Sequence, residues 1–374
     1  MKQRGARAAA GHLWRTRALS LLLALVMVLG LVPGWDLSVT AEAHWADGYL
    51  DQMVEWGFMN SSQTAEPNRA LTRAEFMAIV NRAYGYHEKS SIPFTDVKPE
   101  DWFYDDVSIA YTANYINGTS PTTASPNSTL TREMATAVLG RNMMLKESPG
   151  ELIDFSDGRN VSNWAMGIVK AATENYLIDG YEDGTFQPKR SVTRAEMAAL
   201  MTRTVGTPLQ EAGEYTLDGV FGNVTITSPG VTLKDTVISG DLYVTGGVGL
   251  GDVRLENVTV LGRIIAAGTG VGEKGDVSIL MRNVTADELL VDNLRGQYVS
   301  LRTDGGTQIG KVTVAGSAYL EDNTPQGSGM KLISFEGSEN DQLDLAGRIE
   351  EVITKTPNAT VRLAKGTIEN MTVD

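Results

Sequence analysis

The pattern of apolar and polar residues changes once along the chain, near Pro208. Between Trp45 and Gly206, apolar residues recur three and four positions apart, which is the spacing of one face of an α-helix. Loops rich in Gly, Pro, Asn and Ser interrupt this periodicity and have the composition of turns. The pattern predicts six helices, whose apolar faces carry Leu50, Met53 and Val54; Phe76, Ile79 and Val80; Val107, Ala110 and Tyr111; Ala135, Val138 and Leu139; Ile168, Ala171 and Ala172; and Met197, Leu200 and Met201.

The six predicted helices form three copies of one helix–loop–helix unit. The second helix of each copy begins with a similar phrase, LTRAE at 71–75, LTREM at 130–134 and VTRAE at 192–196. The threonines of these phrases are 59 and 62 residues apart, and a tryptophan stands 28 or 30 residues before each arginine. A single helical hairpin has too small an apolar face to fold alone, so we expect the copies to pack into one all-α domain. Their predicted bounds are 44–89, 90–150 and 151–206.

After Pro208 the helical spacing stops, and short β-rich runs alternate with Asn, Asp and Gly. Residues 231–244 align with 253–265, so that Leu233 lies 22 residues before Leu255, and similar phrases at 281–285 and 301–303 continue less regularly. This period predicts an all-β region over 214–374, preceded by a linker at 207–213. We expect a parallel β-solenoid, in which each rung buries its inward side chains on its neighbours. A β-sandwich of short strands is the alternative.

The first 43 residues resemble an export signal. Five basic residues precede an apolar run at 18–32, and small residues at Ala41 and Ala43 offer two cleavage sites. The run has 15 residues, shorter than the roughly 20 needed to cross a bilayer. We therefore expect a signal peptide at 1–43 and no membrane contact after cleavage, with an uncleaved anchor as the alternative.

Charge and composition exclude several functions. The chain carries 32 Lys and Arg against 46 Asp and Glu, a formal charge of −14, which disfavours binding to nucleic acid phosphates. The absence of cysteine and the presence of only three histidines argue against a thiol nucleophile, a zinc site and a Ser-His-Asp triad. We expect no cofactor and no metal. The segment 179–184 superficially suggests a calcium loop, but Tyr181 and Arg190 stand where oxygen ligands are required, so it is predicted to be a turn.

The repeated residues resemble S-layer homology repeats, most closely in the third copy, which has FSD at 155–157, Trp164, DGYEDGTFQP at 179–188 and VTRAE. In that family a triplet of repeats folds as a pseudo-three-fold spindle, and its grooves hold a pyruvylated secondary cell-wall polysaccharide. The resemblance implies an exported protein held noncovalently at the wall or surface layer of a Gram-positive-type bacterium. The resemblance also implies that copies of this protein associate with one another within such a layer.

The phrases themselves suggest how an acidic sugar could be held. Thr72 with Glu75 and Thr193 with Glu196 form capping boxes, and Thr131 caps the corresponding helix of the second copy, although Met134 replaces its glutamate. The following arginines lie beside free helix amides and the positive end of the helix dipole, where a carboxylate could bind; solvated arginines are the alternative. The tryptophans offer flat faces for sugar rings, with core packing as the alternative. The candidate carbohydrate-binding residues are Arg73, Arg132, Arg194, Trp45, Trp102, Trp164, Gly180 and Tyr181.

We expect the three grooves to differ, with the best one at Arg194, whose loss should weaken wall retention with little effect on folding. In the β-rich half, the acidic residues fall mostly at predicted corners, where they stabilise turns, and no motif links them; they are Asp235, Asp241, Asp252, Glu256, Asp287 and Asp292. We therefore expect a protein that is not an enzyme. The alternatives are a wall-anchored carbohydrate-active enzyme that cleaves polysaccharide with this half, and a surface-layer unit that self-associates through it.

Overall fold

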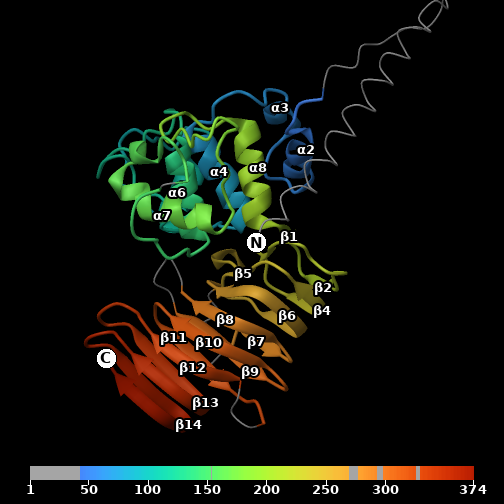
Figure 1. Ribbon diagram of the computed structural model, residues 1–374, viewed down its shortest axis with the longest axis vertical. Coiled ribbons are helices and arrows are strands. Elements are labelled where there is room, and N and C mark those ends of the chain that lie inside the picture. The colour runs from blue at the N-terminus through green and yellow to red at the C-terminus, as the bar shows by residue number, and fades with distance from the viewer. Residues whose placement is uncertain (1–42, 153, 269–276, 293–297, 326–328) are drawn as a thin grey trace, which may run out of the picture. The chain divides into compact units, whose positions relative to one another are not determined.

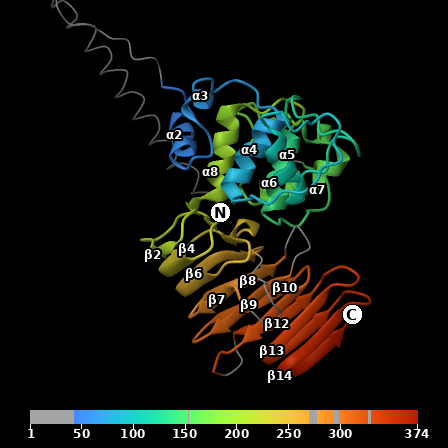
Figure 2. The same ribbon diagram turned by 180° about the vertical axis from the view of Figure 1, so that it is seen from behind.

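The computed structural model describes residues 43–152, 154–268, 277–292, 298–325 and 329–374. The predicted export signal lies almost entirely outside these residues. Trp45–Asp374 form one compact unit, with helices in its first half and strands in its second. Figure 1 shows both halves, and Figure 2 shows them from behind.

In the described residues, the helical half contains the six predicted helices, one short additional α-helix and the 3-10 helix η1 (Gly158–Asn160). The bounds are α2 (Asp47–Glu55), α3 (Ser61–Thr64), α4 (Arg73–Tyr84), α5 (Tyr104–Thr112), α6 (Arg132–Asn142), α7 (Asn163–Glu174) and α8 (Arg194–Val205). The additional helix is α3, where Asn60 and Gln63 form a capping box. A helix of four residues has no apolar face, so periodicity could not predict it.

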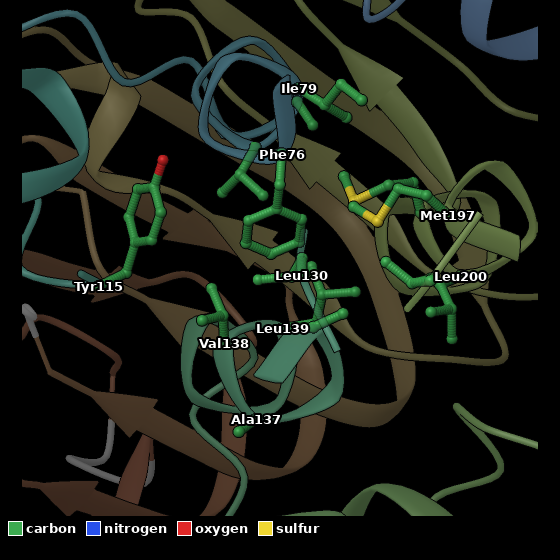
Figure 3. Close-up of a cluster of buried hydrophobic side chains, with 14 of the residues drawn as sticks. Phe76, Ile79, Tyr115, Leu130, Ala137, Val138, Leu139, Met197 and Leu200 are labelled. Atoms are coloured by element: carbon green, nitrogen blue, oxygen red, sulfur yellow. The ribbon is translucent and has the colours of Figure 1, made fainter. Parts of the chain in front are cut away.

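The three copies are arranged around a pseudo-three-fold axis. The amide of Leu71 donates to the carbonyl of Val192, that of Leu130 to Leu71, and that of Val192 to Leu130, at 2.9 to 3.0 Å. This closed cycle of hydrogen bonds joins the residues that precede α4, α6 and α8. The second helices therefore meet at the centre, where Figure 3 shows the ring of Phe76 beside Leu139 and Met197 from the other two copies.

The second half is a parallel β-solenoid. Its strands are β1 (Thr207–Leu209), β2 (Gly213–Tyr215), β3 (Val224–Ile226), β4 (Val231–Ile238), β5 (Leu242–Val244), β6 (Val253–Ala266), β7 (Ile279–Arg282), β8 (Thr285–Val291), β9 (Val299–Asp304), β10 (Gln308–Val314), β11 (Ala318–Asp322), β12 (Met330–Phe335), β13 (Gln342–Thr354) and β14 (Thr360–Val373). Every pairing between these described strands is parallel. The solenoid prediction is confirmed, and the sandwich alternative is wrong because sandwiches are built from antiparallel strands.

The strands stack in two columns, and β6, β13 and β14 are long enough to contribute to both. Leu233 pairs with Leu255, as the sequence alignment predicts. Each column buries a line of aliphatic side chains that are at most 1% exposed; in the first column these are Val231, Val253, Ile279, Leu301 and Leu320. Neighbouring rungs thus bury one another's apolar residues, as in other solenoids.

The two halves share buried contacts. Strand β1 starts two residues after α8 and pairs with β3, so residues 207–209 belong to the solenoid and not to the predicted linker. A strand of three residues gives too short an alternation to be recognised in sequence. The hydroxyl of Tyr243 donates to the carbonyl of Met143 at 2.5 Å, and that of Thr245 to Tyr84 at 2.8 Å. The helical half therefore covers part of the solenoid's apolar surface, including Tyr243 and Ile265.

Candidate functional site

The three central helices begin in the same way. Thr72, Thr131 and Thr193 have extended backbones, and each hydroxyl accepts a hydrogen bond from the amide three residues later. Glu75 and Glu196 complete the capping boxes by accepting from the amides of their threonines. The second copy has no such bond, since Met134 replaces the glutamate. The predicted capping roles of these residues are confirmed.

The first amides of these helices are not free. The backbone amides of Arg73, Arg132 and Arg194 donate to loop carbonyls of Ser128, Arg190 and Arg69, at 2.9 to 3.0 Å. The amides of the next residue in each helix donate to prolines of the same loops, namely Pro126, Pro188 and Pro67. The expectation of free amides that receive a carboxylate was therefore wrong. Any anion at these helix starts must be recognised by side chains.

Each arginine side chain also reaches the loop of a neighbouring copy. The Nε of Arg73 donates to the carbonyl of Ala124, and the Nε of Arg132 donates to that of Phe186, at 2.8 and 2.9 Å. In the third copy, Nη1 of Arg194 donates to the carbonyl of Gln63 at 2.9 Å. All three arginines are buried, so they are fixed in place and are not the solvated residues of the alternative interpretation.

The receiving loops are shaped by the aspartate of the FSD phrase at 155–157 and of the matching FTD phrase at 94–96. The carboxylate of Asp157 accepts from the amides of Phe186 and Gln187, and Asp96 accepts in the same way from Ala124 and Ser125. Gln187 has a φ of 56° and Ser125 a φ of 51°, so the carboxylates stabilise a left-handed turn. Each turn presents the carbonyl to which the arginine of the neighbouring copy donates.

The charges around the three arginines differ. Nη2 of Arg194 lies 2.9 Å from the buried carboxylate of Glu75, and Nη1 lies 3.3 Å from Glu66. Arg73 has no glutamate from the second copy, because Met134 occupies that position. Burial lowers the pKa of Arg73, and the charge of Asp96 opposes this shift. Of the three motif arginines, Arg132 lines a cavity among the described residues, whereas the groove expected to be best was that of Arg194.

A cavity of about 380 Å³ surrounds Arg132. Its guanidinium lies 4.6 Å from the ring centre of Tyr181 and 5.2 Å from that of Phe186, distances typical of cation–π contact. Nη2 donates to the carbonyl of Asp179, and Nη1 lies 3.9 Å from Glu196. Of the predicted site residues, those that line this cavity are Arg132, Trp45, Gly180, Tyr181, Thr193 and Glu196.

Glu196 is the centre of a charged network in the cavity. The hydroxyl of Tyr181 donates to it at 2.6 Å, and Nη1 of Arg190 lies 3.3 Å away. Burial alone would raise the pKa of Glu196, but these bonds, the Thr193 amide and the nearby arginines hold it below its usual value. Burial, together with the hydrogen bond to Glu196, raises the pKa of Tyr181 to about 12. At neutral pH the cavity therefore holds an ionised carboxylate and a neutral phenol.

Two further arginines line the cavity, and the sequence interpretation missed both as site residues. Arg190 and Arg203 have side chains that are 45% and 37% exposed, so both can reach a ligand. Arg203 pairs with Asp179 at 2.7 Å. A signal for Arg203 was present, since an arginine follows each motif arginine by nine residues, at Arg82, Arg141 and Arg203.

The three predicted tryptophans are exposed, at 61%, 63% and 49% for Trp45, Trp102 and Trp164. Core packing is therefore wrong as an account of these side chains. Trp45 lines the cavity, whereas Trp102 and Trp164 lie outside it, and Arg141 is positioned over the ring of Trp164 at 5.9 Å. Gly180 has a packing reason to be glycine, because a Cβ atom would lie 2.4 Å from the ring of Phe155. Sugar contact by all these residues stays a prediction.

The cavity has the chemistry of a binding site. It combines three arginines with three carboxylates, of Asp179, Glu182 and the deeper Glu196, and with a phenol and an exposed indole; its arginines could hold an anionic group beside flat apolar faces. Among the described residues, no group of three His, Cys, Asp or Glu side chains could hold a metal ion.

Known proteins identify these repeats. The family model of the S-layer homology domain matches residues 93–135 and 154–198. Both segments are S-layer homology domains. The first copy has the same capped helix, buried arginine and exposed tryptophan, so residues 45–206 are called the S-layer homology region below.

Similar proteins share a limited part of the chain. The amylopullulanase of Thermoanaerobacterium thermosulfurigenes is 34% identical over 170 residues, which cover 44% of this chain and 8% of that protein. The surface-layer 125 kDa protein of Lysinibacillus sphaericus is 30% identical over 142 residues, or 37% and 12% of the two chains. The cellulosome-anchoring protein of Acetivibrio thermocellus is 29% identical over 152 residues, or 37% and 33%. The chain thus spans a minor part of the length of these relatives.

No helix in the described part of the chain is long and apolar enough to cross a membrane.

Proposed function

We propose that the S-layer homology region holds this protein noncovalently at a bacterial cell wall of the Gram-positive type, by binding an acidic secondary polysaccharide that carries pyruvate. Proteins with very different names share such a region over small parts of their length: a surface-layer protein, an anchoring protein and an amylopullulanase. A shared tether explains this distribution better than a shared reaction does. The chain itself is proposed to be a surface protein and not an enzyme.

The observation that carries the proposal is the cavity at Arg132. A pyruvate ketal presents a carboxylate fixed to a sugar ring, and its recognition requires a guanidinium held in place. Two carbonyl bonds fix Arg132, and the partly exposed Arg190 can turn from Glu196 towards a ligand carboxylate. Tyr181 and Trp45 supply flat surfaces for the ring.

The other two grooves are weaker candidates. The guanidinium of Arg194 is occupied by the buried Glu75, and a ligand carboxylate would have to displace that partner. Arg190 of the Arg132 groove stands four residues before Arg194. The equivalent position in the Arg73 groove, four residues before Arg132, is Ser128, which carries no charge. We therefore propose one principal binding site per chain.

Retention on purified wall tests this proposal. We expect the protein from residue 44 onward to sediment with wall sacculi, and to stay in solution once the secondary polymer has been stripped from them. Arg190→Gln should reduce retention at least about tenfold, because it removes a ligand-facing cation without touching the buried arginine. Arg159→Gln, an exposed arginine of the same copy outside the cavity, is the matched control. Equal retention of the two variants, or unchanged sedimentation with stripped sacculi, would refute the proposal.

The solenoid half is proposed to be displayed by this tether, with self-association in a surface layer as its partner interaction. An enzymatic solenoid would release reducing ends or unsaturated products from a uronate polymer, and we expect neither. Concentration-dependent sedimentation velocity tests self-association.

A further inference from the structure

The outer face of the solenoid carries a cluster of arginines on three successive rungs. Strands β6, β7 and β9 lie side by side there (Figure 2). Arg254 pairs in register with Leu280, which pairs with Arg302. Two residues further along each strand, Glu256 pairs with Arg282, and Arg282 pairs with Asp304. Because rungs are about 4.8 Å apart, Arg254 and Arg302 lie roughly 10 Å apart on either side of Leu280.

These side chains enclose a cavity of about 160 Å³. Arg254 and Arg282 are exposed, and within the described residues neither has an ion pair or a side-chain hydrogen bond. The carboxylates of Glu256 and Asp304 also line the cavity, so the cations are spaced by anions and not concentrated in one basic patch. This arrangement favours a ligand with several separate anionic groups, each of which binds one guanidinium.

Arg302 provides an independent sign of a missing partner. Its Nε atom is buried and, in the described part of the chain, has no hydrogen-bond acceptor, while its Nη1 lies 3.9 Å from Glu321. A buried donor of a charged group without an acceptor is costly, and such groups are rare in folded proteins. An acceptor that enters the cavity would remove this cost.

We propose that this cavity binds carboxylate groups of an acidic glycan, with Arg254, Arg282 and Arg302 as the receiving cations and Leu280 as the apolar floor beneath a sugar ring. Carboxylate is the planar anion that matches a guanidinium in two-bond geometry. The distance between Arg254 and Arg302 is close to the length of two pyranose residues, so one extended uronate chain can meet cations on alternate residues. The site is separate from the S-layer homology region and does not depend on the proposed tether.

Calorimetric titration of the protein from residue 44 onward with trigalacturonate tests this site. Low ionic strength is used because exposed charges are screened by salt. The double variant Arg254→Gln/Arg282→Gln should bind at least about tenfold more weakly than the unsubstituted protein. Arg348→Gln, which removes an exposed solenoid arginine paired with Glu369, should bind normally. Neutral cellotriose should not bind.

Several results would overturn the proposal. These are equal binding by the double variant and the Arg348→Gln control, and equally tight binding of triaspartate or sulfate, which would exclude a glycan-specific site. If the double variant does not fold, as judged by circular dichroism, each single variant is titrated, and a several-fold loss is expected from each. Wall retention of the same variants should be unchanged, so failure here is distinguishable from failure of the tether.

Discussion

At the scale of single residues, the three motif arginines share one backbone position but have different charge partners. The phrase TR at the helix start predicts the cap and the first-turn arginine in all copies, because both are local in sequence. The loops that take up the helix amides come from neighbouring copies, so local sequence could not show that these amides are bonded. The same holds for the pair of Arg194 and Glu75, which are 119 residues apart.

The buried pair leads to a prediction about Arg194. The structure contradicts the expectation that Arg194→Ala leaves folding almost intact, because this change removes one of the two arginines that pair with the carboxylate of Glu75, whose side chain is only 9% exposed; Arg69, at 2.8 Å, is the other. Because Arg69 still pairs with Glu75, the cost is that of a lost charge-assisted hydrogen bond, roughly 1.5–3 kcal/mol of unfolding free energy. Urea unfolding should show this loss, whereas Arg159→Ala, which breaks an exposed pair, should cost less than about 1 kcal/mol. Equal stability of the two variants would contradict the assigned role.

A second residue-scale prediction concerns acid stability. Glu75 and Glu196 have pKa values held below the usual 4.5, since their hydrogen bonds and arginine neighbours outweigh the effect of burial. A lowered folded-state pKa gives stability that is complete above the unfolded value and is lost as pH falls through the folded one. These two groups should therefore change the melting temperature little between pH 7 and about pH 5. At pH values below about 4.5, their protonation should lower the melting temperature. Glu196→Gln should lower the melting temperature at pH 7 and reduce its fall in acid; a fall as steep as that of the unsubstituted protein would contradict this account.

At the scale of elements, the solenoid corners are set by residues that tolerate positive φ. Asp235, Asn257, Asn283 and Gly305 occupy one corner of successive rungs, with φ between 50° and 61°. The side-chain Nδ2 of Asn257 donates to the carboxylate of Asp235 at 2.8 Å, and Nδ2 of Asn283 donates to Oδ1 of Asn257 at 2.9 Å. The Asn, Asp and Gly corners and the 22-residue period therefore predicted the rungs well. The spacing of later rungs varies because the loops differ in length, so their register could not be read from sequence.

This ladder predicts different effects for two substitutions at one position. Asn257→Ala loses two side-chain hydrogen bonds and replaces a residue that tolerates the left-handed region by one that does not, where the strain is roughly 1–2 kcal/mol. Asn257→Gly loses the same bonds without the strain. Thermal unfolding should rank the proteins as unsubstituted, then glycine, then alanine. A glycine variant less stable than the alanine variant would show that backbone conformation does not decide this position.

At the scale of the whole molecule, net charge and ligand charge have the same sign. The chain carries a formal charge of −14, and residues 44–374 carry −17, so long-range attraction opposes binding to an acidic polymer. Recognition must therefore come from local cations, namely the buried Arg132 and the partly exposed Arg190 and Arg203. Composition predicted this requirement, but only the packing of the three copies shows which arginines meet in one cavity.

The most direct test of this account is a crystal structure of the protein from residue 44 onward, soaked with a disaccharide that carries a pyruvate ketal. We expect the sugar in the cavity lined by Arg132, Tyr181 and Trp45, with its carboxylate at Arg190 or Arg132. A disaccharide found at another part of the surface, or no bound sugar under conditions in which wall sacculi retain the protein, would contradict the account.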